Sequence, residues 1–120
     1  MRYLPQIIAL CSLLAPAWSH AGCADAVTAG DASHRYAHRM LRETTLDGAR
    51  RYAKKAEDAA STAMEAADVC ECDDAWAAFY RAVRHARATA KSEDLAGAKE
   101  SAREMMRLAE EGVAAAEHCR

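Results

Sequence analysis

The stretch Cys70-Glu71-Cys72 lies near the middle of this chain and predicts how the rest of it folds. Cys23 stands 47 positions before Cys70, and Cys119 stands 47 positions after Cys72. This symmetric spacing indicates that the chain is built from two units of equal length, which meet at the central stretch.

A shift of 49 residues supports the division, because it aligns identical residues without a gap. Besides the cysteines, the coinciding pairs include Arg35 with Arg84, Leu46 with Leu95, and Gly48 with Gly97. Internal similarity at a fixed period is typical of repeat proteins. We therefore interpret residues 23–70 and 72–119 as tandem copies of one unit within a single domain, residues 22–120.

The composition predicts an all-α protein whose core consists of small side chains. Hydrophobic residues make up 52% of the chain, yet aromatic residues are only 6%, and alanine is the commonest hydrophobic residue. Only two prolines and five glycines interrupt this composition, which favours helix.

Apolar residues at three- and four-residue spacing predict four helices. We expect them over Asp25 to Arg42, Leu46 to Val69, Asp74 to Ala90 and Glu93 to His118. Ser92 is the expected cap of the last helix. The expected inner positions of the first and third helices are Val27, Gly30, His34, Ala37, Leu41, Trp76, Phe79, Val83, Ala86 and Ala90.

Each unit therefore contains one helix that runs out and one that runs back, which brings its two cysteines together. Two such αα-hairpins form an antiparallel four-helix array. Four cysteines allow three pairings, and the hairpins favour Cys23 with Cys70 and Cys72 with Cys119. The alternative joins Cys23 to Cys119 and leaves Cys70 with Cys72 in a strained ring.

Residues 1–21 are expected to be a cleaved signal peptide. Arg2 supplies the positive charge, and the apolar run that follows is too short to span a membrane. Cleavage after Ala21 is favoured. Acylation of Cys23 in a lipoprotein is the alternative, but His20 stands where such signals place a large aliphatic residue.

Removal of the signal takes away Cys11 and leaves four cysteines, which predicts two disulfides in an oxidising compartment. We expect a periplasmic or secreted protein with no transmembrane segment after cleavage. The mature chain has 15 basic and 18 acidic residues, a net charge of −3, so no general affinity for nucleic acid is expected.

The charges are divided along the predicted hairpins. The half that holds the hairpin tips, residues 35–55 and 81–107, has fourteen basic and six acidic residues, a net charge of +8. The remaining stapled half has Arg120 against twelve acids, a net charge of −11. Duplication of one biased hairpin explains this division without any function, and head-to-tail self-association is another explanation.

The functional interpretation is a non-enzymatic binding module whose basic tip contacts an acidic protein or an anionic envelope surface. The expected contacts are Arg39, Arg42, Arg50, Arg51, Arg87, Lys91 and Lys99. The sequence contains no catalytic triad pattern and no phosphate-binding loop, so neither an enzyme nor a cofactor is expected.

His34 and His38 supply the alternative function, a small periplasmic Cu(II)- or Zn(II)-binding protein. One helical turn separates them, so both can bind a metal ion from one face. His34 aligns with Val83 in the second unit, however, which favours a structural role for this histidine.

Overall fold

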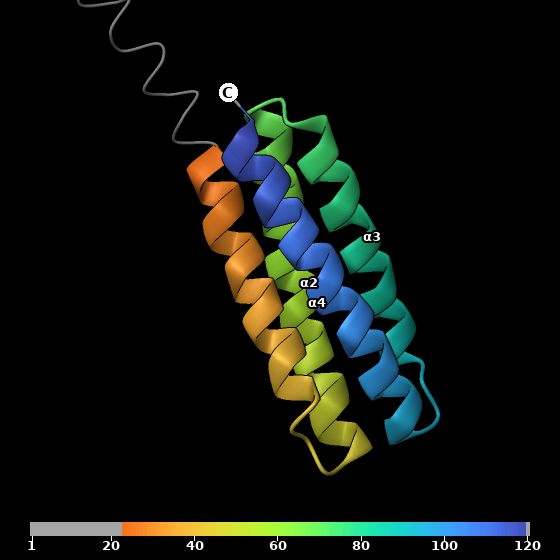
Figure 1. Ribbon diagram of the computed structural model, residues 1–120. Coiled ribbons are helices and arrows are strands. Elements are labelled where there is room, and N and C mark those ends of the chain that lie inside the picture. Colours follow the sequence, from red (N-terminus) through yellow and green to blue (C-terminus); the bar gives the residue numbers. More distant parts are fainter. Residues whose placement is uncertain (1–22, 120) are drawn as a thin grey trace, which may run out of the picture.

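A computed structural model describes residues 23–119 of the chain (Figure 1). Within this range the chain forms four helices and no strand: a first helix over residues 23–40, α2 (Leu46–Val69), α3 (Asp73–Ala90) and α4 (Leu95–His118). Successive helices run antiparallel and lie side by side in one elongated bundle (Figure 1). The predicted all-α array of two stapled hairpins is confirmed; hairpin one denotes residues 23–70 and hairpin two residues 72–119.

The signal peptide and the tandem repeat remain predictions. The signal peptide, residues 1–21, lies outside the described residues. The tandem repeat is not tested by the fold, although α2 and α4 both contain 24 residues and start at positions that differ by 49.

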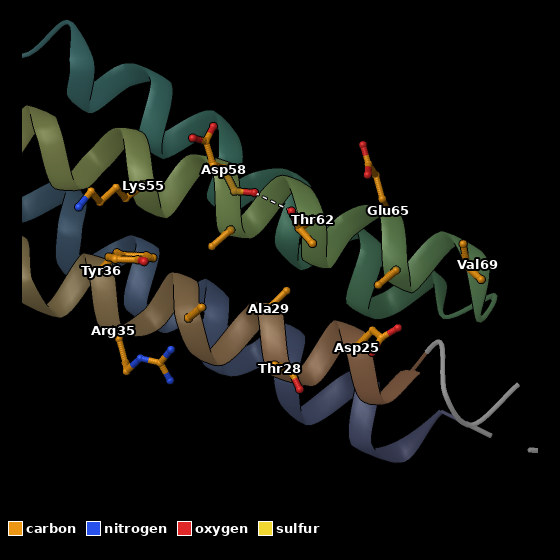
Figure 2. Close-up of a pocket in the computed structure, with 13 residues that line it drawn as sticks. Asp25, Thr28, Ala29, Arg35, Tyr36, Lys55, Asp58, Thr62, Glu65 and Val69 are labelled. Atoms are coloured by element: carbon orange, nitrogen blue, oxygen red, sulfur yellow. Dashed lines mark hydrogen bonds between the residues drawn. The ribbon is translucent and has the colours of Figure 1, made fainter. Parts of the chain in front are cut away.

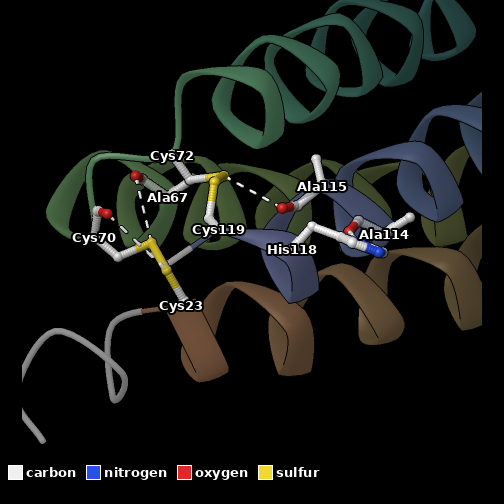
Figure 3. Close-up of a disulfide and its surroundings, with 8 residues drawn as sticks. All are labelled: Cys23, Ala67, Cys70, Cys72, Ala114, Ala115, His118 and Cys119. Carbon is white, nitrogen blue, oxygen red and sulfur yellow. Dashed lines mark hydrogen bonds between the residues drawn. A yellow bond between two sulfur atoms is a disulfide. The ribbon is translucent and has the colours of Figure 1, made fainter.

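Both predicted disulfides are present and lie next to each other at one end of the bundle (Figure 3). Cys23 pairs with Cys70 at a Cα–Cα distance of 5.4 Å, and Cys72 pairs with Cys119 at 5.8 Å. The alternative pairing is therefore wrong. Each hairpin is closed by its own bond, and the two hairpins join through Glu71 alone.

The chain turns between the hairpins by a helix-ending motif that normally uses glycine. The amide of Cys72 donates to the Ala67 carbonyl at 2.9 Å, and the amide of Glu71 donates to the Asp68 carbonyl at 3.1 Å. This is the Schellman pattern, whose turning residue adopts the left-handed conformation. Glu71 does so with φ of 58°, at a steric cost that a glycine would avoid.

The two long helices start in the same way. The Thr45 side chain accepts a hydrogen bond from the Gly48 amide at 3.1 Å, and the Asp94 carboxylate accepts one from the Gly97 amide at 2.6 Å. The predicted cap Ser92 is wrong, because α4 begins two residues later than expected and Asp94 takes that role. The first helix also ends early, because the amides of residues 41–43 bond three residues back in a tight turn.

Alanine dominates the core, as predicted. In α2 the buried stripe consists of Ala49, Ala53, Ala56, Ala60, Ala63 and Ala67. Side chains this small let neighbouring backbones approach closely, so a first-helix hydroxyl reaches the α2 backbone. The buried Ser33 donates to the Ala56 carbonyl at 3.1 Å.

One large side chain of hairpin two fills the space left by glycine in hairpin one. Phe79 is fully buried between Gly30 of the first helix and Gly112 of α4. A Cβ atom at Gly30 would lie 2.8 Å from the Phe79 ring, and one at Gly112 would lie 2.5 Å from it. Gly30 and Phe79 are partners in the 49-residue alignment, so the two units complement each other at this level.

Some of the predicted inner positions are wrong. In the first helix the buried stripe contains Ala26, Ser33 and Met40, whereas Val27, His34 and Leu41 are only half-buried. In α3, Ala90 is exposed, and Trp76 keeps 38% of its surface exposed and stacks on Tyr80. The buried stripe of α3 runs through Ala75, Ala78 and Phe79, and Trp76 lies beside it at the edge of the core.

Replacing Glu71 with Gly is expected to raise the free energy of unfolding by about 0.5–1 kcal/mol, because glycine adopts the left-handed conformation without steric cost. Urea denaturation of the oxidised protein measures the change. As a control, Glu100→Gly on the exposed face of α4 is expected to lower stability by about 1 kcal/mol. A loss of stability in Glu71→Gly would contradict the assignment of strain to this turn.

Replacing Gly112 with Ala is expected to lower the free energy of unfolding by about 1–3 kcal/mol, although Ala is the better helix former. The added methyl group would overlap the Phe79 ring. Combining the change with Phe79→Leu should make it less harmful than it is alone, as chemical denaturation can measure. If the two changes are simply additive, the Phe79 ring is not what excludes a side chain at Gly112.

Candidate functional site

The positive charge of the described chain is confined to the half of the bundle that lies away from the disulfides. All fourteen Lys and Arg residues between 23 and 119 belong to residues 35–55 and 81–107. They come from all four helices and most are exposed. Together they form a belt around the tip half, which we call the basic belt.

The seven predicted contacts all belong to this belt, but Arg50 and Arg87 also form polar contacts within the bundle. Arg50 is half-buried and donates through Nη2 to the Ser92 carbonyl at 2.5 Å, which ties α2 to the turn before α4. Arg87 places Nε 3.5 Å from the Glu57 carboxylate on α2. The other five predicted contacts are the exposed Arg39, Arg42, Arg51 and Lys91 and the half-buried Lys99.

Acidic residues stand beside Arg42 and Lys91 of the belt at the tip end of the bundle. They lie in the two tip turns and the first turn of α2: Glu43, Asp47, Glu93 and Asp94. Asp94 caps α4, and the Glu43 carboxylate covers Gly48 at the start of α2. Helix N-termini favour such anions, so these acids stabilise local structure and leave the belt as the basic surface.

Hairpin one carries an aromatic and cationic cluster that the sequence analysis did not identify. Arg39 lies over the Tyr52 ring, with its guanidinium carbon 5.8 Å from the centroid. The Lys55 ammonium lies 5.4 Å from the Tyr52 centroid and 5.9 Å from that of Tyr36. A sequence pattern could have revealed this cluster. Tyr36 and Arg39 are three residues apart, as are Tyr52 and Lys55, so each pair lies on one helix face.

Next to this cluster, a groove of about 820 Å³ runs along the outer side of the first helix and α2 (Figure 2). We call it the hairpin-one groove. Its lining includes the small residues Ala29, Ala32, Ala59 and Ala66. Thr28, Asp58 and Thr62 also line it between its two ends (Figure 2). Arg35, Tyr36 and Lys55 lie toward one end, and Asp25, Glu65 and Val69 lie toward the other (Figure 2). The groove therefore has a middle of alanine, threonine and one acid between ends of opposite charge.

Hairpin two carries a smaller groove of different chemistry, of about 580 Å³, whose lining is mostly charged and polar: His85, Gly97, Glu100, Ser101, Arg103, Glu104 and Arg107. Ala59 corresponds to Leu108, which is fully buried. Lys55 corresponds to Glu104, which pairs with Arg107, and Arg107 also lies 3.3 Å from the Glu111 carboxylate. These opposite charges on hairpin two neutralise each other, whereas in the described structure Lys55 takes part in no such ion pair.

The Arg107 and Glu104 side chains shift each other's protonation. The hydrogen bond from Arg107 holds the pKa of the Glu104 carboxyl below its usual value, and the same bond raises the pKa of the Arg107 guanidinium. The lowered pKa of Glu104 favours the folded state above its ordinary pKa, and this contribution disappears as the pH falls through the lowered value.

The two histidines of the metal hypothesis have different surroundings. His34 Nε2 lies 2.8 Å from the Glu110 carboxylate and so connects the first helix to α4, whereas His38 is exposed. In the part of the chain that the structure describes, no three His, Cys, Asp or Glu side chains converge to hold a metal ion. No observation favours metal binding over the contact between His34 and Glu110.

No family model, curated protein or solved structure matches this chain. Between residues 23 and 119, no helix is long and apolar enough to cross a membrane. The function must therefore be inferred from the distribution of charged and apolar side chains.

Replacing Arg107 with Gln is expected to raise the pKa of Glu104 toward its ordinary value, because the hydrogen bond that favours the carboxylate is weakened. An NMR titration of the side-chain carboxyl carbons measures it. The control Glu111→Gln keeps Arg107 bonded to Glu104 and should leave most of the lowering intact. Equal Glu104 titration curves in Arg107→Gln and the unchanged protein would show that another group lowers this pKa.

Proposed function

We propose that this protein is an exported, non-enzymatic binding module whose basic belt contacts an acidic partner protein. The observation that carries the proposal is the charge division: every Lys and Arg between residues 23 and 119 lies in the tip half. A cleft or surface lined with acidic residues would be attracted to this half and repelled by the other.

The arrangement of the belt favours an acidic protein over an anionic membrane. A membrane that met the bundle end-on would meet the acidic residues of the tip turns as well as Arg42 and Lys91. A membrane that met it side-on would touch only one or two of the four helices that carry the basic residues. An acidic protein that surrounds the tip can contact several helices at once, so it uses more of the positive charge.

Export is part of the proposal and rests on two features. The N-terminal segment has the pattern of a signal peptide, and two disulfides are typical of oxidising compartments such as the periplasm or the cell exterior. A stapled bundle of this kind keeps its shape without a large core, which suits a small binding module outside the cytoplasm.

Reversing the charge of Arg39, Arg42, Arg51 and Lys91 to Glu is expected to weaken binding of a poly-glutamate peptide at low salt by at least about tenfold. The remaining binding should depend little on salt, because the attraction has been removed. Isothermal titration calorimetry measures both effects, and circular dichroism verifies that the variant is folded.

The matched control replaces Arg39, Arg42 and Arg51 with Lys, which keeps the charge and should keep most of the affinity. Binding that survives the reversal with its salt dependence intact would refute the proposal. Vesicles of phosphatidylglycerol and phosphatidylcholine supply the competing surface. Tighter binding to these vesicles than to the peptide would favour a membrane over an acidic protein.

A further inference from the structure

The charged ends of the hairpin-one groove are arranged symmetrically about its middle. On the first helix, Asp25 and Arg35 are ten residues apart, with their midpoint at residue 30. On α2, Lys55 and Glu65 are also ten residues apart, with their midpoint at residue 60. Since the two helices run in opposite directions, both acids lie at one end and both bases at the other.

The contacts between the two helices place these midpoints side by side. The disulfide aligns residue 23 with residue 70, and the hydrogen bond from Ser33 aligns residue 33 with residue 56. Interpolation between these two contacts puts residue 30 beside residue 60. The basic and acidic ends of the groove are therefore about 15 Å apart along the bundle, on either side of one common level.

We propose that this groove face is the interface of an antiparallel homodimer, with the two-fold axis crossing the groove at the level of residues 30 and 60. The rotation places Arg35 opposite Asp25 of the second copy and Lys55 opposite Glu65 of the second copy. Each pairing occurs twice, so the interface contains four pairs of opposite charge. The reverse, parallel arrangement would place like charges together.

The small residues of the groove allow the copies to come close. The side chains of Ala29, Ala32, Ala59 and Ala66 would face the middle of a second four-helix arrangement, built from the first helix and α2 of each copy. Asp58 is the acid nearest the middle and falls level with Thr62 of the second copy, so it does not meet its own symmetry mate directly.

Hairpin two lacks this symmetric placement of acids and bases. The interface is therefore assigned to the groove face of hairpin one. At the matching positions Lys55 becomes Glu104 and Glu65 becomes Ala114. The acid of one end and the base of the other are therefore both missing on α4. A two-fold contact through the face between α3 and α4 would have no such complementary ends.

The size of the overlap predicts a weak dimer. Copies centred on residue 30 overlap over about 20 Å and are two helices wide, so they would bury on the order of 800–1,000 Å² in total. This is at the low end for specific interfaces. The tips project beyond the overlap at both ends, so the dimer presents two basic belts. The inference goes beyond the proposed function, which does not require it.

The test is sedimentation equilibrium at low salt, over protein concentrations up to the millimolar range. An acidic-ended variant carries Arg35→Glu and Lys55→Glu, and a basic-ended variant carries Asp25→Lys and Glu65→Lys. Each alone is expected to dimerise at least about tenfold more weakly than the unchanged chain, because like charges then meet. An equal mixture of the two should restore dimers.

The control variant, Arg84→Glu with Arg103→Glu, changes the net charge as much as the acidic-ended variant does but on the other hairpin. It should dimerise like the unchanged chain and should associate with the basic-ended variant more weakly than the acidic-ended variant does. A monomeric unchanged chain overturns the inference, as does a mixture of folded variants that stays monomeric. Equal behaviour of the control and acidic-ended variants also overturns it. None of these variants changes the four belt residues that test the proposed function, so the two proposals can fail independently.

Discussion

The pair of disulfides at the seam is the constraint on which the rest of the structure depends. A core made mostly of alanine methyl groups removes little apolar surface from water per residue, so burial alone gives a bundle of this size modest stability. Each bond closes a loop with a sequence separation of 47 residues, which by the loop-entropy model contributes about 4 kcal/mol. The same bonds set the register of each hairpin, because they hold the two helices level at one end. With the register set, the alanine stripes of neighbouring helices meet and the backbones approach closely.

Close approach makes the bundle sensitive to single large side chains, and the two hairpins divide these unequally. Phe79 in hairpin two occupies the space that Gly30 leaves in hairpin one, and two phenylalanines at these positions would collide. Leu108 is fully buried where hairpin one has Ala59. Hairpin two therefore supplies much of the bulk of the core, while hairpin one keeps an open groove on its outer side. One pattern of helices thus produces two different surfaces, and the surface with the hairpin-one groove also carries the tyrosines and the cations beside them.

The charge division does not follow from helix stability. In α2 the basic residues lie near the start and most acids near the end, which is the unfavourable direction for the helix dipole. A bundle selected for stability alone would favour the opposite arrangement in its two long helices. The acids at the tip cap helices or lie near helix starts, where they bond free amides and favour the helix dipole. We therefore propose the basic belt as a surface for an acidic partner, and the hairpin-one groove as a surface for a second copy.

From the sequence alone, the cysteine spacing and the 49-residue alignment determined the disulfide pairing and the hairpin order, because these depend on chain length and symmetry. The bounds of α2 were also predictable, since a cap and a cysteine limit it. The tertiary structure alone decided which side of the first helix is buried: Gly30 and Ala37 suit either stripe, and packing selected Ser33 over His34. It also decided that Trp76 stays at the edge, because the buried stripe of α3 runs through Ala75, Ala78 and Phe79. The groove, finally, required the fold, since only the antiparallel register brings Asp25 level with Glu65 and Arg35 level with Lys55.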